Sequence, residues 1–207
     1  MLTMTPFSAE LHRPLNGISS GPRRTGFTLI EMMIAVAVIA ILIRIVAPTL
    51  RDVVLNARMA AQASTLMVDL ATARSEAVHR STRVAICTSS TGVACTNTSW
   101  DQGWLLFVDK DLDGNVSAGE QVLKVSSALH VGNTLIVSGD AAAPGGGRYV
   151  PYRPSGAVFP DATSAVTFQM CDERTKANVG DSAAQDKGRL ITISNAGRPV
   201  VSRITCN

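Results

Sequence analysis

The sequence predicts an α+β fold in which one long N-terminal helix packs on an antiparallel β-sheet. Three features of the 207-residue chain support this prediction. An apolar run over residues 27–46 is followed by helical spacing of apolar residues to about residue 80. From Ser81 onward, short β-branched runs alternate with clusters of Gly, Pro, Asn and Asp. Aromatic residues make up only 4% of the chain, so we expect one modest core built from aliphatic side chains.

The apolar run has the length of a membrane span, because about 20 residues at ~1.5 Å rise match a ~30 Å hydrocarbon core. Its only charged residues are Glu31 and Arg44. A carboxylate at this depth costs roughly 2.5 to 3.5 kcal/mol, so Glu31 marks a function or a specific pairing. Arg44 either extends to the lipid headgroups or pairs with an acid of a neighbouring subunit. Pro48 removes one helical hydrogen bond, which predicts a kink.

The stretch Gly26-Phe27-Thr28-Leu29-Ile30-Glu31 follows Arg23 and Arg24. It resembles the class III leader of type IV prepilins and type II secretion pseudopilins. The resemblance implies that prepilin peptidase cuts between Gly26 and Phe27 and methylates the new amino terminus. It also implies that Glu31 pairs with the amino group of a neighbouring subunit during assembly. An ordinary signal peptide fits poorly, because its apolar region spans only about 7 to 15 residues.

The resemblance sets the expected organisation of the chain. We expect a leader at 1–26, a transmembrane and filament-core helix at 27–47, an amphipathic helix at 48–80 and a periplasmic β-rich domain at 81–207. Basic residues before the span predict a cytoplasmic N-terminus in the inner membrane. The implied partners are other major and minor pilins or pseudopilins, prepilin peptidase and inner-membrane lipid. The net charge of +3 says little about further partners.

Beyond Pro48, apolar and small residues recur at steps of three and four, which predicts that the helix continues to about His79. This stripe suits packing against a sheet or against sister helices. Its members are Leu50, Val53, Val54, Ala57, Ala61, Ser64, Met67, Val68, Ala71 and Val78.

Seven β-branched segments are predicted to be strands. They span residues 83–88, 104–109, 121–125, 134–137, 165–171, 189–194 and 199–205. The last two form a hairpin that turns at Asn195-Ala196-Gly197. The glycine-rich segment 144–147 lacks the Gly-Lys-Ser/Thr ending of a phosphate loop, so we assign it no nucleotide.

The cysteines Cys87, Cys95, Cys171 and Cys206 all lie beyond the membrane segment, where disulfides form. Three pairings are open to them. Pairing Cys87 with Cys95 and Cys171 with Cys206 is the pattern that the family resemblance implies. A zinc site is the alternative, but the CxxC spacing is absent.

Residues 109–120 match the twelve-position calcium-loop template, with glycine at the sixth position. The oxygen-bearing residues are Asp109, Asp111, Asp113, Asn115, Ser117 and Glu120. The flanking segments are predicted strands, so the loop is not an EF-hand. A calcium site and a plain polar hairpin turn both remain open.

A second set of residues makes the chain similar to the GspH/FimT branch of minor pilins and pseudopilins. The set comprises Gly103, Trp104, Phe107, Val108, Asp109, Cys87, Cys95, Gly197 and Arg198. This resemblance implies a pilin-like fold and a subunit that helps to initiate or cap a type IV pilus or a type II secretion pseudopilus. No acid–base pair or nucleophile constellation is evident, so we do not expect an enzyme.

Some FimT-type members of the branch bind DNA through a C-terminal Gly-Arg-x-Arg motif. Here only Gly197 and Arg198 fit, and Arg203 is the next basic residue. Arg189, Arg198 and Arg203, together with Lys187, predict a basic edge that contacts phosphates. DNA uptake in natural transformation is therefore the alternative function. Solvent-exposed arginines on a terminal hairpin are equally ordinary.

Overall fold

The computed structural model describes residues 26–138, 148–158, 165–174 and 187–206, apart from the side chain of Pro48. Contacts divide the chain into two units, Met1–Val46 and Ala47–Asn207, and each is considered by itself. Residues 1–25 of the predicted leader and the glycine-rich segment 144–147 lie outside the described residues. Helix α1, Leu29–Arg80, contributes to both units.

Helix α1 begins with a polar cap. The hydroxyl oxygen of Thr28 accepts a hydrogen bond from the backbone N–H of Glu31 at 3.3 Å, which satisfies a donor that has no partner within the helix. The Glu31 carboxylate in the first turn also complements the positive end of the helix dipole. In the first unit, every side chain from Gly26 to Val46 is exposed. Nothing in the described part of that unit covers its apolar residues.

In the second unit, α1 carries a narrow buried stripe that packs on the β-strands. Its apolar members are Met59, Ala63, Leu66, Leu70, Ala73 and Ala77. The helix runs to Arg80, so its predicted end is confirmed. The stripe expected from the sequence does not pack on the sheets, because all its members except the half-buried Met67 are exposed. The buried stripe lies on the opposite side of the helix, where Leu66 and Leu70 carry more apolar surface than the alanines.

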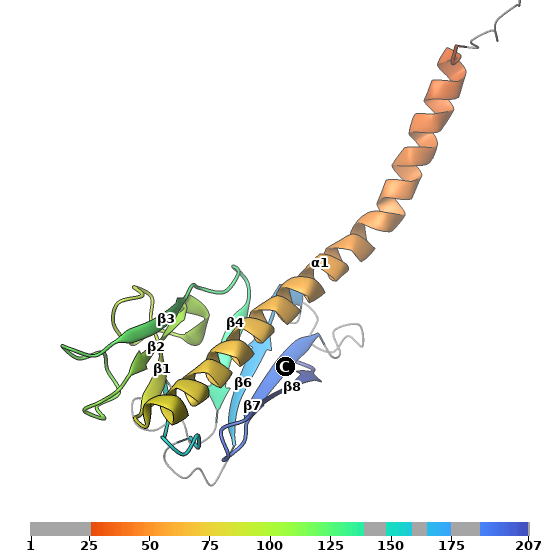
Figure 1. Ribbon diagram of the computed structural model, residues 1–207. Helices are drawn as coiled ribbons and strands as arrows, with labels where there is room; N and C mark the ends of the chain where they lie inside the picture. Colours follow the sequence, from red (N-terminus) through yellow and green to blue (C-terminus); the bar gives the residue numbers. More distant parts are fainter. Residues whose placement is uncertain (1–25, 139–147, 159–164, 175–186, 207) are drawn as a thin grey trace, which may run out of the picture. The chain divides into compact units, whose positions relative to one another are not determined.

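Within the described residues, eight strands form two antiparallel sheets, shown in Figure 1. The first has the order β3-β2-β1-β5 and the second the order β4-β6-β7-β8. The bounds are β1 Val84–Thr88, β2 Trp104–Val108, β3 Val122–Ser126, β4 Thr134–Ser138, β5 Tyr149–Tyr152, β6 Val166–Cys171, β7 Gly188–Ile193 and β8 Pro199–Ile204. A short 3₁₀ helix, η1 Trp100–Gln102, precedes β2.

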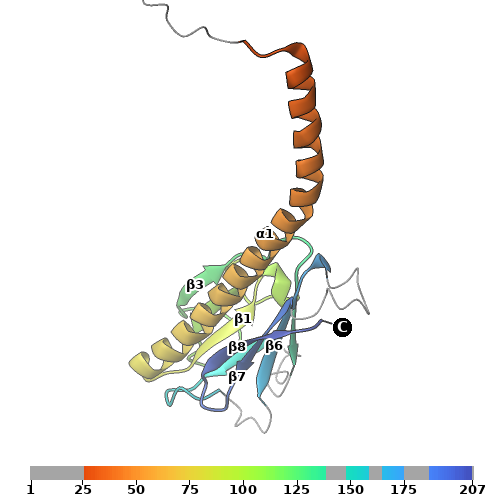
Figure 2. The same cartoon turned by 90° about the vertical axis from the view of Figure 1, so that its right-hand side faces the viewer.

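The main core lies between α1 and the two sheets, and Figures 1 and 2 show the second half of α1 along the strands. Trp100 meets Phe168 edge to face at 4.9 Å between ring centroids, a favoured aromatic geometry. A second, smaller cluster covers the other face of the first sheet and contains Leu105, Phe107 and Tyr149. The first sheet is therefore buried on both faces at β1 and β2.

The seven predicted strands are confirmed to within one residue at each end. The predicted α+β fold, a long helix packed on antiparallel strands, is confirmed, although the strands divide into two sheets where the sequence predicted one. Strand β5 was not predicted. It is short and contains Pro151, which cannot donate to a ladder, and the structure accommodates this proline by placing β5 at the edge of its sheet.

Candidate functional site

The predicted cleavage position lies in exposed, non-helical chain. Gly26 and Phe27 precede α1, and Phe27 is 78% exposed. A Cβ atom at Gly26 would meet no atom within 4 Å, so packing in the described chain does not explain this glycine. The Glu31 carboxylate accepts no hydrogen bond and forms no ion pair within the described residues. The backbone N–H of Glu31 donates a hydrogen bond to the Thr28 hydroxyl oxygen.

The second half of α1 contains a buried carboxylate that the sequence reasoning missed. Asp69 is fully buried, and its Oδ2 atom accepts hydrogen bonds from Trp104 Nε1 at 2.8 Å and Ser126 Oγ at 2.6 Å. The Lys124 ammonium pairs with Oδ1. A charge buried with three donors is a structural anchor that ties α1 to β2 and β3. It also gives Trp104 of the family motif a structural role.

A second polar anchor joins α1 to the end of β6. Arg174 donates to Asp172, to Asn56 Oδ1 at 2.9 Å and to Asp52 Oδ1 at 3.3 Å. The hydrogen bond from Arg174 lowers the pKa of the Asp52 carboxyl, against a smaller opposing effect of burial. Lys187 lies 3.6 Å from Asp52 Oδ2. One predicted member of the basic edge is therefore occupied in an ion pair.

The four cysteines form two disulfides, Cys87–Cys95 and Cys171–Cys206. The pairing that the resemblance implied is confirmed. No thiolate remains free to hold zinc. The first disulfide closes a loop beside β1, and the second ties the C-terminal end of the chain to β6.

The calcium-like loop connects β2 with β3, so its strand flanks are confirmed. Asp109 is fully buried at its start, and its Oδ2 atom accepts a hydrogen bond from the Tyr149 hydroxyl and lies 3.7 Å from Arg83 Nη1. Burial, and then the bond to Asp109, raise the pKa of Tyr149. At the other end, Glu120 accepts hydrogen bonds from the backbone N–H groups of Lys110 and Ser117 at 2.6 and 3.0 Å.

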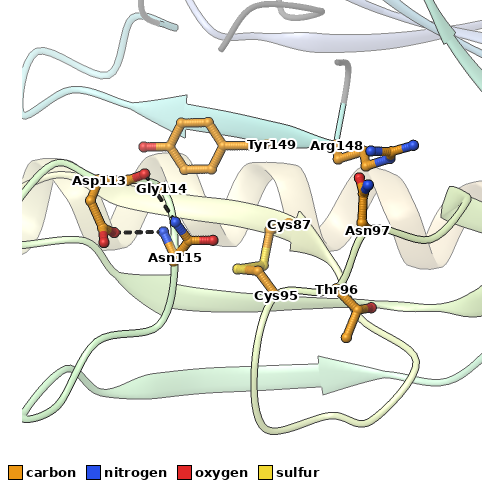
Figure 3. Close-up of a pocket in the computed structure, with 9 residues that line it drawn as sticks. All are labelled: Cys87, Cys95, Thr96, Asn97, Asp113, Gly114, Asn115, Arg148 and Tyr149. Carbon is orange, nitrogen blue, oxygen red and sulfur yellow. Dashed lines mark hydrogen bonds between the residues drawn. A yellow bond between two sulfur atoms is a disulfide. The ribbon is translucent and has the colours of Figure 1, made fainter. Parts of the chain in front are cut away.

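A pocket of about 390 Å³ opens between this loop and the Cys87–Cys95 loop (Figure 3). Asp113, Gly114 and Tyr149 lie at one end, and Arg148 and Asn97 at the other. A Cβ at Gly114 would come within 3.3 Å of the Tyr149 ring, which favours glycine here beyond its φ of +79°. Among its lining residues there is no nucleophile with an adjacent base.

The predicted basic edge is only partly assembled. Arg189 of β7 and Arg203 of β8 are direct cross-strand partners. Burial, and then the neighbouring Arg203 charge, lower the pKa of Arg189. Arg198 lies at the turn end of the same hairpin, about 16 Å away along the strand at ~3.3 Å per residue. The two cross-strand arginines therefore form one basic pair, and Arg198 stands apart.

Gly197 has a packing role that does not involve DNA. It adopts a φ of +75°, and a Cβ there would lie 2.0 Å from the Gly156 carbonyl oxygen. The Arg74 Nε atom donates to the carbonyl oxygens of Gly156 and Ala196 at 3.1 and 3.2 Å. The β7–β8 turn therefore packs closely against the segment after β5, and only glycine fits at position 197.

Two family profiles match the chain. Residues 62–197 match the family described as type II transport protein GspH. Residues 21–43 match the prokaryotic N-terminal methylation motif. A search of curated proteins found no match.

Solved structures similar to the chain include two bacterial minor subunits. The type IV minor pilin FimU of Pseudomonas aeruginosa is 21% identical, with 70% of this chain and 87% of that chain covered and a TM-score of 0.47. The minor pseudopilin EpsH from the type 2 secretion system of Vibrio cholerae is 10% identical, with 72% and 97% covered and a TM-score of 0.43.

Proposed function

We propose that the chain, which belongs to the family described as type II transport protein GspH, is a pilin-like minor subunit that acts in the initiation or at the tip of a type IV pilus or a type II secretion pseudopilus. The family consists of structural subunits, and the chain carries the methylation motif and an apolar helix long enough to cross a membrane. In the proposed pathway, the chain inserts into the inner membrane with its N-terminus in the cytoplasm and its β-rich unit in the periplasm. Prepilin peptidase then cuts after Gly26 and methylates Phe27.

The observation that carries this proposal is the complete exposure of the first half of α1. Its apolar side chains point outward on all sides, and α1 is long and apolar enough to cross a membrane. A helix that is hydrophobic all round requires lipid or other helices as its surroundings. The Glu31 carboxylate has no partner in the described chain, which fits pairing with the amino terminus of a neighbouring subunit.

A second surface supports packing with sister helices. Apart from the half-buried Met67, the apolar and small residues of α1 that the sequence singled out lie on the side away from the sheets and are exposed. Val53 is 63% exposed and Val68 53% exposed. Because Ala57, Ala61 and Ser64 are small, another helix can approach this side closely. We assign it to contacts with neighbouring pilins or pseudopilins.

Substitution of Glu31 tests the pairing role. Glutamine preserves a hydrogen-bonding side chain at the capping position but removes the charge, whereas alanine removes both. We expect both Glu31→Ala and Glu31→Gln to insert into the membrane normally and to be lost from sheared filaments or cross-linked assemblies. Incorporation of Glu31→Gln at the wild-type level would show that the charge has no assembly role.

Processing is tested separately. We expect Gly26→Leu to remain uncut by prepilin peptidase, because the peptidase of this family cuts after glycine. Mass spectrometry of the membrane fraction would show the full leader on this variant, and a methylated Phe27 terminus on the wild type and on Glu31→Gln. Cleavage of the leucine variant at the same bond would refute the assigned site.

DNA binding is the second candidate function, and the cross-strand pair Arg189 and Arg203 is the observation that favours it. Two like charges directly opposite each other are unfavourable, so a bound phosphate would relieve their repulsion. Arg203 is exposed and has no ion-pair partner within the described residues. The occupied Lys187 and the distant Arg198 limit this surface to a few phosphate contacts.

A DNA mobility shift with the full chain in detergent across a salt series tests this candidate. If the pair contacts phosphates, binding weakens steeply with salt, and Arg203→Ala reduces both the affinity and the salt slope. Arg80→Ala is the matched control, because Arg80 is an exposed arginine whose ion pair with Glu76 lies at the C-terminal end of α1. Equal binding by the two variants would exclude the Arg189 and Arg203 pair as the DNA site.

A further inference from the structure

The loop between β2 and β3 gathers hard oxygen donors in one place. One carboxylate oxygen from each of Asp109, Asp111 and Glu120 lies within 4.8 Å of the others. These residues occupy positions 1, 3 and 12 of the twelve-position calcium-loop template. The template glycine, Gly114, has a φ of +79°, a conformation that glycine adopts without strain.

Asp109 provides an independent sign that something is bound here. Its side chain is fully buried, and its Oδ2 atom is occupied by Tyr149 and Arg83. The Oδ1 atom is buried as well and accepts no hydrogen bond from the described chain. A buried carboxylate oxygen without a partner is costly and rare, and a bound ion is one of the few groups that satisfies it.

The rest of the loop holds the donors together without using up their lone pairs. Glu120 accepts one backbone N–H at each oxygen, from Lys110 and Ser117. Asp113 accepts the Asn115 N–H at 2.7 Å and the Ser117 hydroxyl at 3.3 Å. An ionised carboxylate has about four acceptor sites, so each side chain can still bind a cation. The positive charges of Lys110 and Arg83 are outnumbered by the carboxylates of the loop.

We propose that residues 109–120 form a calcium site in a β-hairpin loop. The ligands are the carboxylates of Asp109, Asp111 and Glu120, and the remaining oxygens of the template come from Asp113, Asn115 and Ser117. An all-oxygen set on an irregular loop suits Ca²⁺, whereas Mg²⁺ demands a near-ideal octahedron and zinc prefers nitrogen and sulfur. Calcium bound here would fix the wall of the pocket formed by Asp113, Gly114 and Asn115 (Figure 3).

Calcium titration of the full chain in detergent, after removal of metal with a chelator, tests the site. We expect one Ca²⁺ per chain by calorimetry, with a dissociation constant of about 10⁻⁵ to 10⁻³ M and much weaker binding of Mg²⁺. Asp111→Asn and Asp113→Asn alter exposed side chains and should weaken binding at least about tenfold. Asp101→Asn makes the same chemical change outside the loop and should bind as the wild type does.

Thermal unfolding gives a second readout that separates a ligand role from a folding role. Without calcium, Asp111→Asn should unfold at the same temperature as the wild type, because within the described residues its side chain accepts a hydrogen bond only from the Asp113 N–H. With calcium, the unfolding temperature of the wild type and of Asp101→Asn should rise and that of Asp111→Asn should not. Absence of saturable binding, or an equal rise in all variants, would overturn the proposal.

Discussion

The two halves of helix α1 differ in how their apolar side chains are covered. Between Gly26 and Val46 every side chain is exposed, although almost all are apolar. Between Met59 and Ala77 one side of the helix is buried by the strands of its own chain. Both halves are α-helical, so the difference comes from the surroundings that each half requires. In the proposed function, lipid or other subunits surround the first half.

Two of the four carboxylates on helix α1, Glu31 and Asp69, show the same contrast. Asp69 in the second half is buried and has three donors from β2 and β3 within its own chain. Glu31 in the first half has no side-chain partner in the described residues. A buried charge needs a partner to be tolerated. The chain therefore supplies the partner for Asp69, and the proposed assembly supplies one for Glu31.

The largest expected effect comes from truncating one leucine in each half. Leu70→Ala removes a fully buried side chain and should lower the free energy of unfolding of the β-rich unit by about 3 to 5 kcal/mol. Leu42→Ala, at a side chain that is 54% exposed, should leave that free energy unchanged. Denaturant unfolding in detergent, followed by the fluorescence of Trp100 and Trp104, measures both. A comparable loss in Leu42→Ala would contradict the separation of the two halves.

The next effect concerns the two carboxylates. Asp69→Asn keeps one acceptor oxygen but places an amide donor among three donors, so we expect a loss of about 2 to 3 kcal/mol. The Lys124 contribution to this loss is small because that side chain is 42% exposed. Glu31→Gln should not change the stability of the β-rich unit at all. Circular dichroism is the suitable probe, because Trp104 is itself a partner of Asp69.

The sequence was enough to predict that α1 has one apolar half and a second half with helical spacing of apolar residues. It was not enough to predict which side of that second half packs on the strands. The spacing of residues 50 to 78 was correct for a helix, yet two stripes of apolar residues run along it on opposite sides. Leu66 and Leu70 face the sheets, and Val53 and Val68 do not. Spacing alone does not decide between two such stripes, because the choice depends on strands that lie far away in the sequence.

The same limit applies to the candidate sites, because contacts between residues far apart in the sequence cannot be predicted from local patterns. The β2–β3 loop and the β7–β8 hairpin were recognisable because their signals are local in sequence, whereas the cysteine pairs were implied by the family resemblance. Asp69 was not recognisable, since its partners Trp104, Lys124 and Ser126 follow it by more than thirty residues. The basic edge was predicted as one group, and the strand register separates Arg198 from the pair of Arg189 and Arg203.

A third prediction compares the disulfides, which lie only in the β-rich unit. Cys171–Cys206 has a sequence separation of 35 residues and Cys87–Cys95 one of 8. The disulfide that closes the longer loop restricts the unfolded chain more. Its removal should therefore lower the free energy of unfolding by about 1 kcal/mol more than removal of the other disulfide. Paired Cys→Ala variants, unfolded by denaturant, measure the difference. An equal or reversed order would mean that local packing, and not chain entropy, decides the effect.

The smallest effect at neutral pH is expected at the tyrosine hydroxyls. The chain has two tyrosines, Tyr149 and Tyr152, and both lie in the buried β5 strand. Tyr149 bonds to Asp109, whereas the Tyr152 hydroxyl is buried without a hydrogen-bond partner in the described chain. Tyr152→Phe should therefore change the free energy of unfolding by less than about 1 kcal/mol at pH 7, or increase it.

At alkaline pH the same hydroxyl becomes important. Burial raises the pKa of Tyr152 in the folded chain, while the unfolded value stays near the ordinary value of about 10. The unfolded chain therefore loses this proton first. The contribution of Tyr152 to the free energy of unfolding is constant below a pH of about 10 and falls as the pH rises further. Tyrosinate absorbance should appear together with unfolding, and Tyr152→Phe should make the fall in stability less steep. Ionisation of both tyrosines at their ordinary pKa in the folded chain would show that β5 is open to water, and would remove the contrast between a sealed β-rich unit and an exposed N-terminal helix.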